Sequence, residues 1–211
     1  MKLDGSILRK TLFFIVAGAV LAGLVYLVIY LTDAGEVDIP LEEGKVFRYE
    51  GEYVSRGSQK SITMRAHPHK IVVERGFEDE GKNQFLVVFY SGDHRWHAFI
   101  LMPGDDGLYM RMGKKLTMVL PRHVKRGMKW EFNHGNEVIR AQAGGVRTFD
   151  TPMGKIRARE IMYHLERRSR AAIWVNKDVG VVALYYSYLS EGASRSEANL
   201  QLVSTETLVE D

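Results

Sequence analysis

Histidine side chains, the groups that most often bind metals or move protons, gather at two places in this sequence. His67 and His69 are two residues apart, so on a strand both imidazoles lie on one face. Zinc requires three or four ligands converging at about 2.0–2.1 Å. However, Pro68 favours a turn or a sheet edge, and His94 and His97 would face opposite sides of a strand. We therefore interpret these histidines as surface or turn residues and predict no metal site.

The carboxylates do not form a recognisable catalytic pattern. Asp105 and Asp106 resemble part of a cation-binding loop, but the ligand spacing of an EF-hand is absent and a hairpin accounts for them. Glu160 and Glu166 could share a strand face, as the paired carboxylates of a glycosidase do, although solvated sheet faces commonly carry such charges. No G-x-S-x-G elbow and no glycine-rich phosphate loop occurs. We predict no enzymatic activity and no cofactor, with a hydrolase as the alternative.

Aromatic and methionine side chains are more informative. Methionine is flexible and fits irregular binding surfaces as well as gaps in a core, and barrel-like sheets can offer apolar pockets. Ordinary core packing and a concave pocket for an acyl chain or a hydrophobic peptide are both compatible with this composition. The residues that we expect in one of these two roles are Phe89, Trp96, Phe99, Met110, Met112, Trp130 and Tyr186.

The elements that must position these side chains are strands. Phe47, Tyr49 and Tyr53 are expected on one face of a strand, with charged residues on the other. Similar segments of strand-like length, rather than long amphipathic helices, follow. They alternate apolar and polar residues, or are rich in aromatic and branched residues, at 62–66, 84–90, 96–102, 161–166 and 181–189.

Turn-forming residues separate these segments at regular intervals. Short strands joined by tight turns favour an antiparallel meander, and the absence of alternating strand-helix units argues against a parallel sheet. We predict an all-β fold: one antiparallel β-meander domain of about ten strands, arranged as a curved sheet, a half-barrel or a sandwich. The expected turns lie at 79–83, 91–93, 103–107, 134–136, 144–145, 151–154 and 176–178.

Residues 11–32 contain no charged side chain. A helix of this length reaches about 33 Å, enough to cross a hydrocarbon core of about 30 Å. Lys2, Arg9 and Lys10 precede it and acidic residues follow it, and basic flanks stay in the cytoplasm. We predict an uncleaved, single-pass transmembrane helix in the inner (cytoplasmic) membrane. A cleaved signal peptide is the alternative, although its apolar region usually spans about 7–15 residues.

The predicted organisation follows from this span. We expect a cytoplasmic tip at 1–10, the transmembrane helix at 11–32, an acidic tether at 33–43, an extracytoplasmic (periplasmic) β-domain at 44–208 and a tail at 209–211. Small residues spaced four apart allow close packing against another transmembrane helix. The residues in this pattern are Gly18, Ala19, Ala22 and Gly23.

Charge and cysteine content exclude several classes of protein. Of 29 Lys and Arg residues three lie in residues 1–10, and of 26 Asp and Glu residues one does, so the remainder has a net charge of +1. Binding of nucleic acid therefore has no support from charge. The chain has no cysteine, which excludes disulfides, thiol chemistry and a lipoprotein anchor on a processed cysteine.

Three motifs made of turn residues and a core aromatic follow an initial Ile39-Pro40-Leu41 segment. They are Leu120-Pro121 with Gly127 and Trp130, Thr151-Pro152-Met153-Gly154-Lys155-Ile156-Arg157-Ala158, and Trp174 with Val179-Gly180-Val181-Val182. In this order the chain resembles a group of uncharacterised bacterial cell-envelope proteins. It departs from their pattern at Ile156, where an aromatic is usual, and at Val179, where a glycine is usual. That group is similar to the LolA/LolB-like carriers, whose curved antiparallel sheet holds lipidated cargo.

Two functional hypotheses follow. The first is a non-catalytic, membrane-anchored β-domain that docks other cell-envelope proteins through its sheet edge or loops, and this role demands least of the residues. The second is a carrier or sensor that binds a lipid or another apolar ligand on the concave face of the sheet. A connected internal cavity would favour the carrier, whereas a filled core with a flat apolar outer patch would favour docking.

Overall fold

The computed structural model of the chain describes residues 35–56, 61–79, 81–165, 169–189 and 195–208. The chain divides into two units, residues 1–34 and residues 35–211. The predicted membrane span at 11–32, with Gly18, Ala19, Ala22 and Gly23, lies outside the described residues, as do the tips at 1–10 and 209–211. Within the described ranges, no helix combines the length and the apolar character that crossing a membrane requires.

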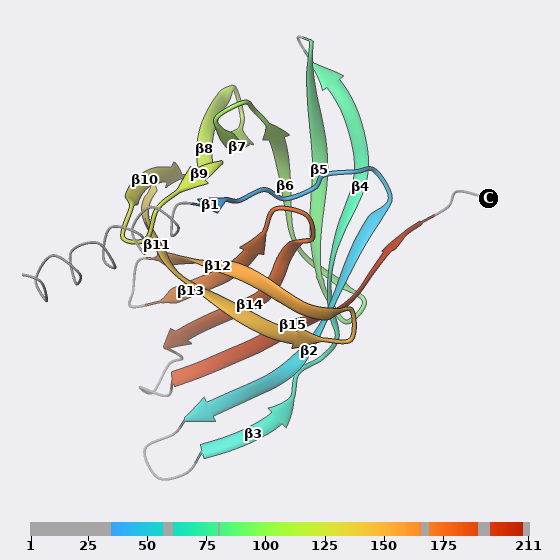
Figure 1. Ribbon diagram of the computed structural model, residues 1–211, viewed down its shortest axis with the longest axis vertical. Coiled ribbons are helices and arrows are strands. Elements are labelled where there is room, and N and C mark those ends of the chain that lie inside the picture. The colour runs from blue at the N-terminus through green and yellow to red at the C-terminus, as the bar shows by residue number, and fades with distance from the viewer. Residues whose placement is uncertain (1–34, 57–60, 80, 166–168, 190–194, 209–211) are drawn as a thin grey trace, which may run out of the picture. The chain divides into compact units, whose positions relative to one another are not determined.

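The described part of the second unit consists of strands joined by turns, with no helix (Figure 1). The all-β prediction is confirmed, although the strands are more numerous than the sequence indicated. They are β1 (Gly35–Glu36), β2 (Lys45–Arg56), β3 (Ser61–Arg65), β4 (His69–Asp79), β5 (Lys82–Ser91), β6 (His94–Pro103), β7 (Gly107–Met112), β8 (Lys115–Pro121), β9 (His123–Val124), β10 (Lys129–His134), β11 (Glu137–Thr151), β12 (Gly154–His164), β13 (Arg170–Asn176), β14 (Gly180–Leu189) and β15 (Arg195–Thr207).

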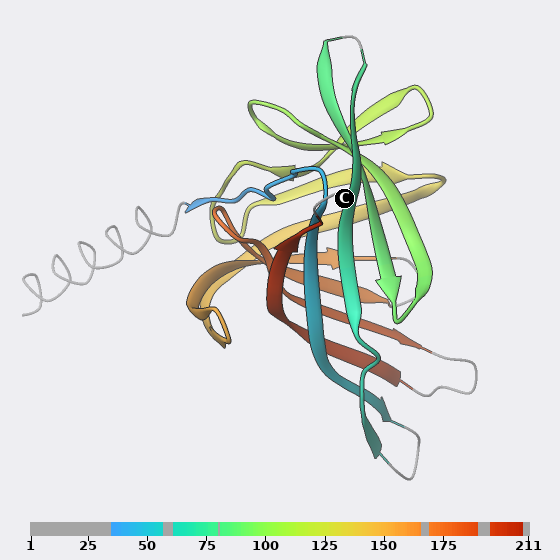
Figure 2. The ribbon, with the colours of Figure 1, turned by 90° about the vertical axis from the view of Figure 1, so that its right-hand side faces the viewer.

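One antiparallel sheet contains most of these strands, in the order β10-β11-β12-β13-β14-β15-β2-β4-β5-β6-β7-β8, with β3 paired to β2. Figures 1 and 2 show how this sheet curls. Its two ends approach each other, and the Trp130 indole of β10 donates a hydrogen bond to the Val119 carbonyl of β8 at 3.1 Å. The sheet is thus a nearly closed barrel. This confirms the predicted curved sheet, and a sandwich of two sheets is excluded.

The two faces of the sheet differ as the alternation predicted. Phe47 and Tyr49 are buried on the concave side, where the Tyr49 hydroxyl donates a hydrogen bond to the Val181 carbonyl at 2.9 Å. Arg48, between them, pairs with Glu206 on the opposite face. Period-two alternation is what separates the two sets of side chains.

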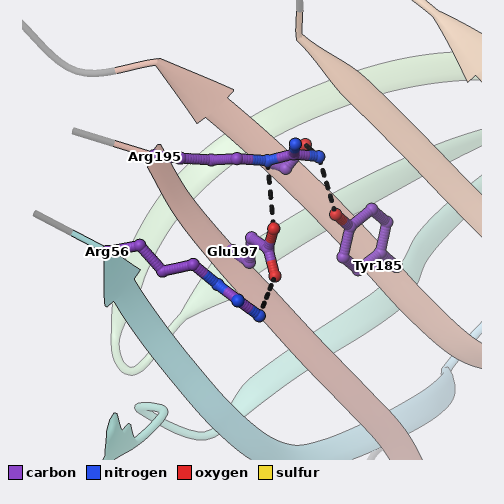
Figure 3. Close-up of polar contacts among 5 residues, drawn as sticks. Arg56, Tyr185, Arg195 and Glu197 are labelled. Carbon is purple, nitrogen blue, oxygen red and sulfur yellow. Dashed lines mark hydrogen bonds and ion pairs between the residues drawn. The ribbon is translucent and has the colours of Figure 1, made fainter. Parts of the chain in front are cut away.

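A network of charges occupies the outer face of β2, β14 and β15 (Figure 3). Glu197 lies between Arg56, at 3.4 Å, and Arg195, at 3.0 Å. The Arg195 guanidinium also lies 3.5 Å from the hydroxyl of Tyr185. These contacts join three neighbouring strands on the side of the sheet that faces away from the core.

Residues 35–43, predicted as an acidic tether, contribute to the fold. β1 pairs with β9, and the Val37 amide donates a hydrogen bond to the Arg122 carbonyl at 2.8 Å. Val37 is only 2% exposed, and Ile39 and Leu41 pack against the same core cluster. The apolar residues between the acidic ones explain the difference, because their burial draws this segment into the barrel.

One predicted turn is wrong. Gly144 and Gly145 do not form a turn, because β11 runs through them with a bulge between Ala143 and Val146. A Cβ at Gly144 would collide with the Glu160 side chain, so this glycine leaves room for that side chain.

The apolar residues of β3 are exposed although they alternate with polar ones. Ile62 and Met64 are 52% and 51% exposed. The reason is that β3 pairs with the far part of β2, beyond the residues that β2 shares with β4. Alternation alone did not reveal that this strand lies at an edge.

Candidate apolar binding cavity

The concave side of the barrel is hollow. Its cavity has a volume of about 670 Å³, which is within the range of about 300–1,000 Å³ typical of small-molecule sites. The cavity opens where the β10–β11 and β12–β13 hairpins turn, since His134, Glu137, Leu165 and Ser169 line it there. Its mouth therefore lies at one rim of the barrel.

The wall of the cavity comes from strands around the barrel, from β4 to β8 and from β10 to β15. Most of the wall is apolar, so the space favours hydrocarbon over water. Its deeper lining residues are Ile71, Phe89, Phe99, Leu101, Met110, Phe132, Ile139, Ile173 and Leu184.

The floor of the cavity is formed by the filled core of the barrel. Leu108, Leu120 and Leu200 line the cavity and are each at most 5% exposed. Ile39 also lines it, on the segment that the sequence assigned to a tether. The tether residues thus contribute to the inner surface of the site.

An aromatic group lies at the rim, where it connects strands that are far apart in the sheet. The Trp96 ring of β6 is 5.6 Å from the Tyr186 ring of β14, and the His69 ring of β4 is 6.5 Å from Trp96. Trp96 is 51% exposed. We name Trp96, Tyr186 and His69 the rim aromatics; an exposed indole beside an apolar cavity is a ready contact for an amphipathic ligand.

A β-bulge explains why Trp96 and His97 both line the cavity although they are consecutive. Phe89 pairs with His97 and Tyr90 pairs with Arg95, so Trp96 has no partner in the ladder. Bulges commonly redirect a side chain in this way. The sequence rule that successive residues point to opposite faces fails here for that reason.

Aromatic contacts continue from the rim into the cavity. Phe99 packs edge-to-face on Phe89 at 5.6 Å and lies 6.1 Å from the His134 ring across the seam between β8 and β10. Phe132 packs edge-to-face on Tyr163 at 6.1 Å. Of these contacts, the one between Phe99 and His134 crosses the seam, where the described strands β8 and β10 are not paired in a ladder.

Two titratable groups of the cavity are shifted by burial. Burial lowers the pKa of His69, although its ring nitrogen Nδ1, 2.6 Å from the His67 carbonyl, opposes part of the shift. Burial raises the pKa of Tyr163, so its phenol stays protonated at neutral pH. Both shifts favour the uncharged forms, which suits an apolar ligand.

Five of the seven predicted apolar residues line the cavity: Phe89, Trp96, Phe99, Met110 and Tyr186. The other two, Met112 and Trp130, do not; they pack beside the cluster of Met110, Phe132 and Ile139 at the seam. In the sequence the five lining residues are related only by residue type. In the structure they lie on separate strands around one cavity.

Sequence reasoning missed Tyr163, His97 and His134 as cavity residues. For Tyr163 the signal was present, since it alternates with Ile161 and Leu165 on one strand face. The histidines carried no such signal, because their position depends on the bulge and on how the barrel closes. Among the described residues, no three His, Asp or Glu side chains are arranged to hold a metal ion.

No protein-family model matches the chain, and no curated protein matches it by sequence. Among solved structures, a Bacteroides fragilis protein assigned as exported, with a YmcC-like fold, is similar with a TM-score of 0.51 and 12% identity, over 82% of this chain and 100% of its own. A Parabacteroides distasonis protein assigned as a lipoprotein has a TM-score of 0.41 and 9% identity, over 82% and 99%. The first similarity shows that the fold resembles the YmcC-like one.

Proposed function

We propose that the β unit binds an apolar ligand, such as an acyl chain, in the cavity. This is the carrier or sensor role that the sequence left as the second hypothesis. The observation that carries the proposal is the hollow of about 670 Å³, walled by aromatic and aliphatic side chains. A filled concave side would have favoured docking instead.

The energetics of burial support the proposal. Each methylene removed from water contributes about 0.8 kcal/mol, so ten of them supply about 8 kcal/mol before the cost of association is subtracted. The ligand meets a wall already formed by the strands, and the rigid aromatic rings of Phe99 and Phe132 limit the ordering that binding requires.

The proposed activity is ligand binding without catalysis. The proposed location is the cell envelope. The uncharged segment 11–32 and its basic flank support anchoring in the inner membrane with the β unit outside the cytoplasm. The Bacteroides fragilis protein of similar fold is assigned as exported, which agrees with that location.

Docking of another envelope protein remains the second candidate. The observation in its favour is the exposed apolar pair Ile62 and Met64 on the edge strand β3. The strands at the two ends of the curled sheet, β8 and β10, face each other across the seam and are less available for strand addition.

The test is mass spectrometry of lipid retained by the full-length chain purified in a maltoside detergent. Ala171 lines the cavity, so Ala171→Trp should fill it and abolish retention of stoichiometric lipid. Val138, 45% exposed on β11 and outside the cavity lining, supplies the control Val138→Trp. Leu184→Trp is a second filling variant, and circular dichroism verifies the β signal of each. Equal retention by all variants would mean that the lipid lies around the membrane span.

A further inference from the structure

On two strands, the polar residues that line the cavity lie nearer its mouth than the apolar ones. Moving inward along β10, His134 at the rim is followed by Phe132, and along β6 His97 is followed by Phe99 and Leu101. Two residues of strand span about 7 Å. Along these two strands the lining therefore changes from imidazoles at the rim to hydrocarbon side chains further in.

Tyr163 places a polar group inward of the rim histidines. Its ring lines the cavity and packs on Phe132, which lies two residues further inward along β10 than His134. Within the described residues its hydroxyl has no hydrogen-bond partner. A phenolic hydroxyl can donate a hydrogen bond, so a ligand oxygen placed beside it would have a donor.

The rim adds further hydrogen-bonding groups and little negative charge. His97 and His134 are exposed on either side of Phe99, with ring centroids 6.0 and 6.1 Å from it. Glu137, beside His134 in the ladder, is the one carboxylate among the described lining residues. Imidazole N–H groups donate to oxygen acceptors in either protonation state.

We propose that the ligand is an acyl-chain amphiphile bound tail first, with its carbonyl-bearing head accepting hydrogen bonds from Tyr163, His97 and His134. This inference rests on the proposed function and names the ligand class. The tail extends toward Leu108 and Leu120 at the floor. A carboxylic acid and an acyl ester share this chemistry, because both present a carbonyl oxygen.

Orientation is tested by photolabelling the full-length chain in maltoside micelles. Two palmitic acid probes are used, one with a diazirine at the ω end and one with a diazirine beside the carboxyl group, and labelled peptides are mapped by mass spectrometry. We expect the ω probe to label the floor strands β7 and β8 and the carboxyl-side probe to label the rim near Trp96 and His97. The reversed pattern, or one pattern for both probes, would overturn the inference.

Recognition of the head is tested with Tyr163→Phe, which keeps the ring and removes the hydroxyl. Unlabelled palmitic acid, methyl palmitate and hexadecane compete with the ω probe. Loss of one hydrogen bond predicts about fivefold weaker competition by the two carbonyl compounds and no change for hexadecane. Tyr109→Phe is the control, because the Tyr109 hydroxyl donates to Asp106 at 2.7 Å and does not line the cavity.

The outcomes separate this inference from the proposed function. Absence of cavity labelling by both probes in the wild type would refute apolar binding, and the inference with it. Labelling that is unaffected by Tyr163→Phe for all three competitors would refute only the assigned head contact. If palmitic acid competes and methyl palmitate does not, the natural ligand is a free fatty acid. If both compete equally, the site also accepts an esterified lipid. Either of these results supports the inference.

Discussion

Inside the barrel, Val37, Tyr49 and Leu202 are each at most 2% exposed, whereas at the mouth of the cavity Trp96 is 51% exposed beside a hollow of about 670 Å³. The same sheet forms both regions. In the filled region, β1 and the residues after it occupy the space; toward the rim, the aromatic rings stand around an empty centre. Stability is thereby concentrated in one part of the interior and ligand contact in the other.

This contrast has a simple physical origin. A closed packing arrangement gains dispersion contacts on all sides of each side chain, whereas a side chain beside a void lacks neighbours on one side. Natural cores are rarely hollow on this scale. The region around Phe99 and Phe132 therefore gives up some stability relative to a filled core, which is expected of a binding site.

The largest effect is expected from placing a charge in the filled region. Val37→Asp would bury an unpaired carboxylate and should cost about 4 kcal/mol or more of unfolding free energy. Val146, 40% exposed, supplies the control Val146→Asp, which should change little. Denaturant unfolding of the full chain measures both. Equal stability of the two variants would show that residues 35–41 do act as a tether.

The direct comparison of the two regions uses truncations of similar chemistry. Leu202→Ala should cost about 3 kcal/mol, because Leu202 is fully enclosed. Phe99→Ala should cost less, about 1 kcal/mol, because the ring already borders a void on one side. Denaturation midpoints with unchanged slopes provide the measurement. A larger loss for Phe99→Ala would mean that the cavity wall is as important to stability as the core.

A pH effect of smaller size should come from His69 at the rim. Burial lowers its pKa below the ordinary value of 6.5, so the unfolded chain binds the proton more readily. The contribution of His69 to stability is present above pH 6.5 and is lost as the pH falls toward the lowered folded-state pKa. Melting temperatures at pH 7.5 and 5.5 should therefore differ less in His69→Gln than in the wild type.

The control for this measurement is His94→Gln, since His94 is exposed and does not line the cavity. It should keep the pH dependence of the wild type. The same pH dependence in all three proteins would indicate that the His69 imidazole is as well solvated in the folded state as in the unfolded one.

The smallest effect is expected on the outer face. Arg56 is 62% exposed and pairs with Glu197 at 3.4 Å. Arg56→Ala should cost about 0.5 kcal/mol or less, because exposed ion pairs are weakened by solvent and salt. A loss above about 1 kcal/mol in denaturant unfolding would show that the charged network of β2 and β15 stabilises the sheet as a unit.

Much of the fold could be predicted from residues because strand alternation is local. The placement of Phe47 and Tyr49 on one face, and the hairpin turn at 151–154, depend on neighbours within a few positions. The exposure of Ile62 and Met64 could not be predicted in this way, because it depends on which strand lies beyond β2. The bulge that brings Trp96 and His97 to one side is also a property of a strand pair.

By itself, the sequence determined that the chain has strands with one apolar face, turns between them and enough aromatic residues to fill a core. Only the tertiary structure decided that β8 meets β10, that residues 35–41 occupy the filled region, and that Phe89, Phe99 and Tyr163 surround a hollow. The reason is that periodicity assigns a side chain to a face, whereas a cavity depends on the distance between faces, which the curvature and closure of the whole sheet set.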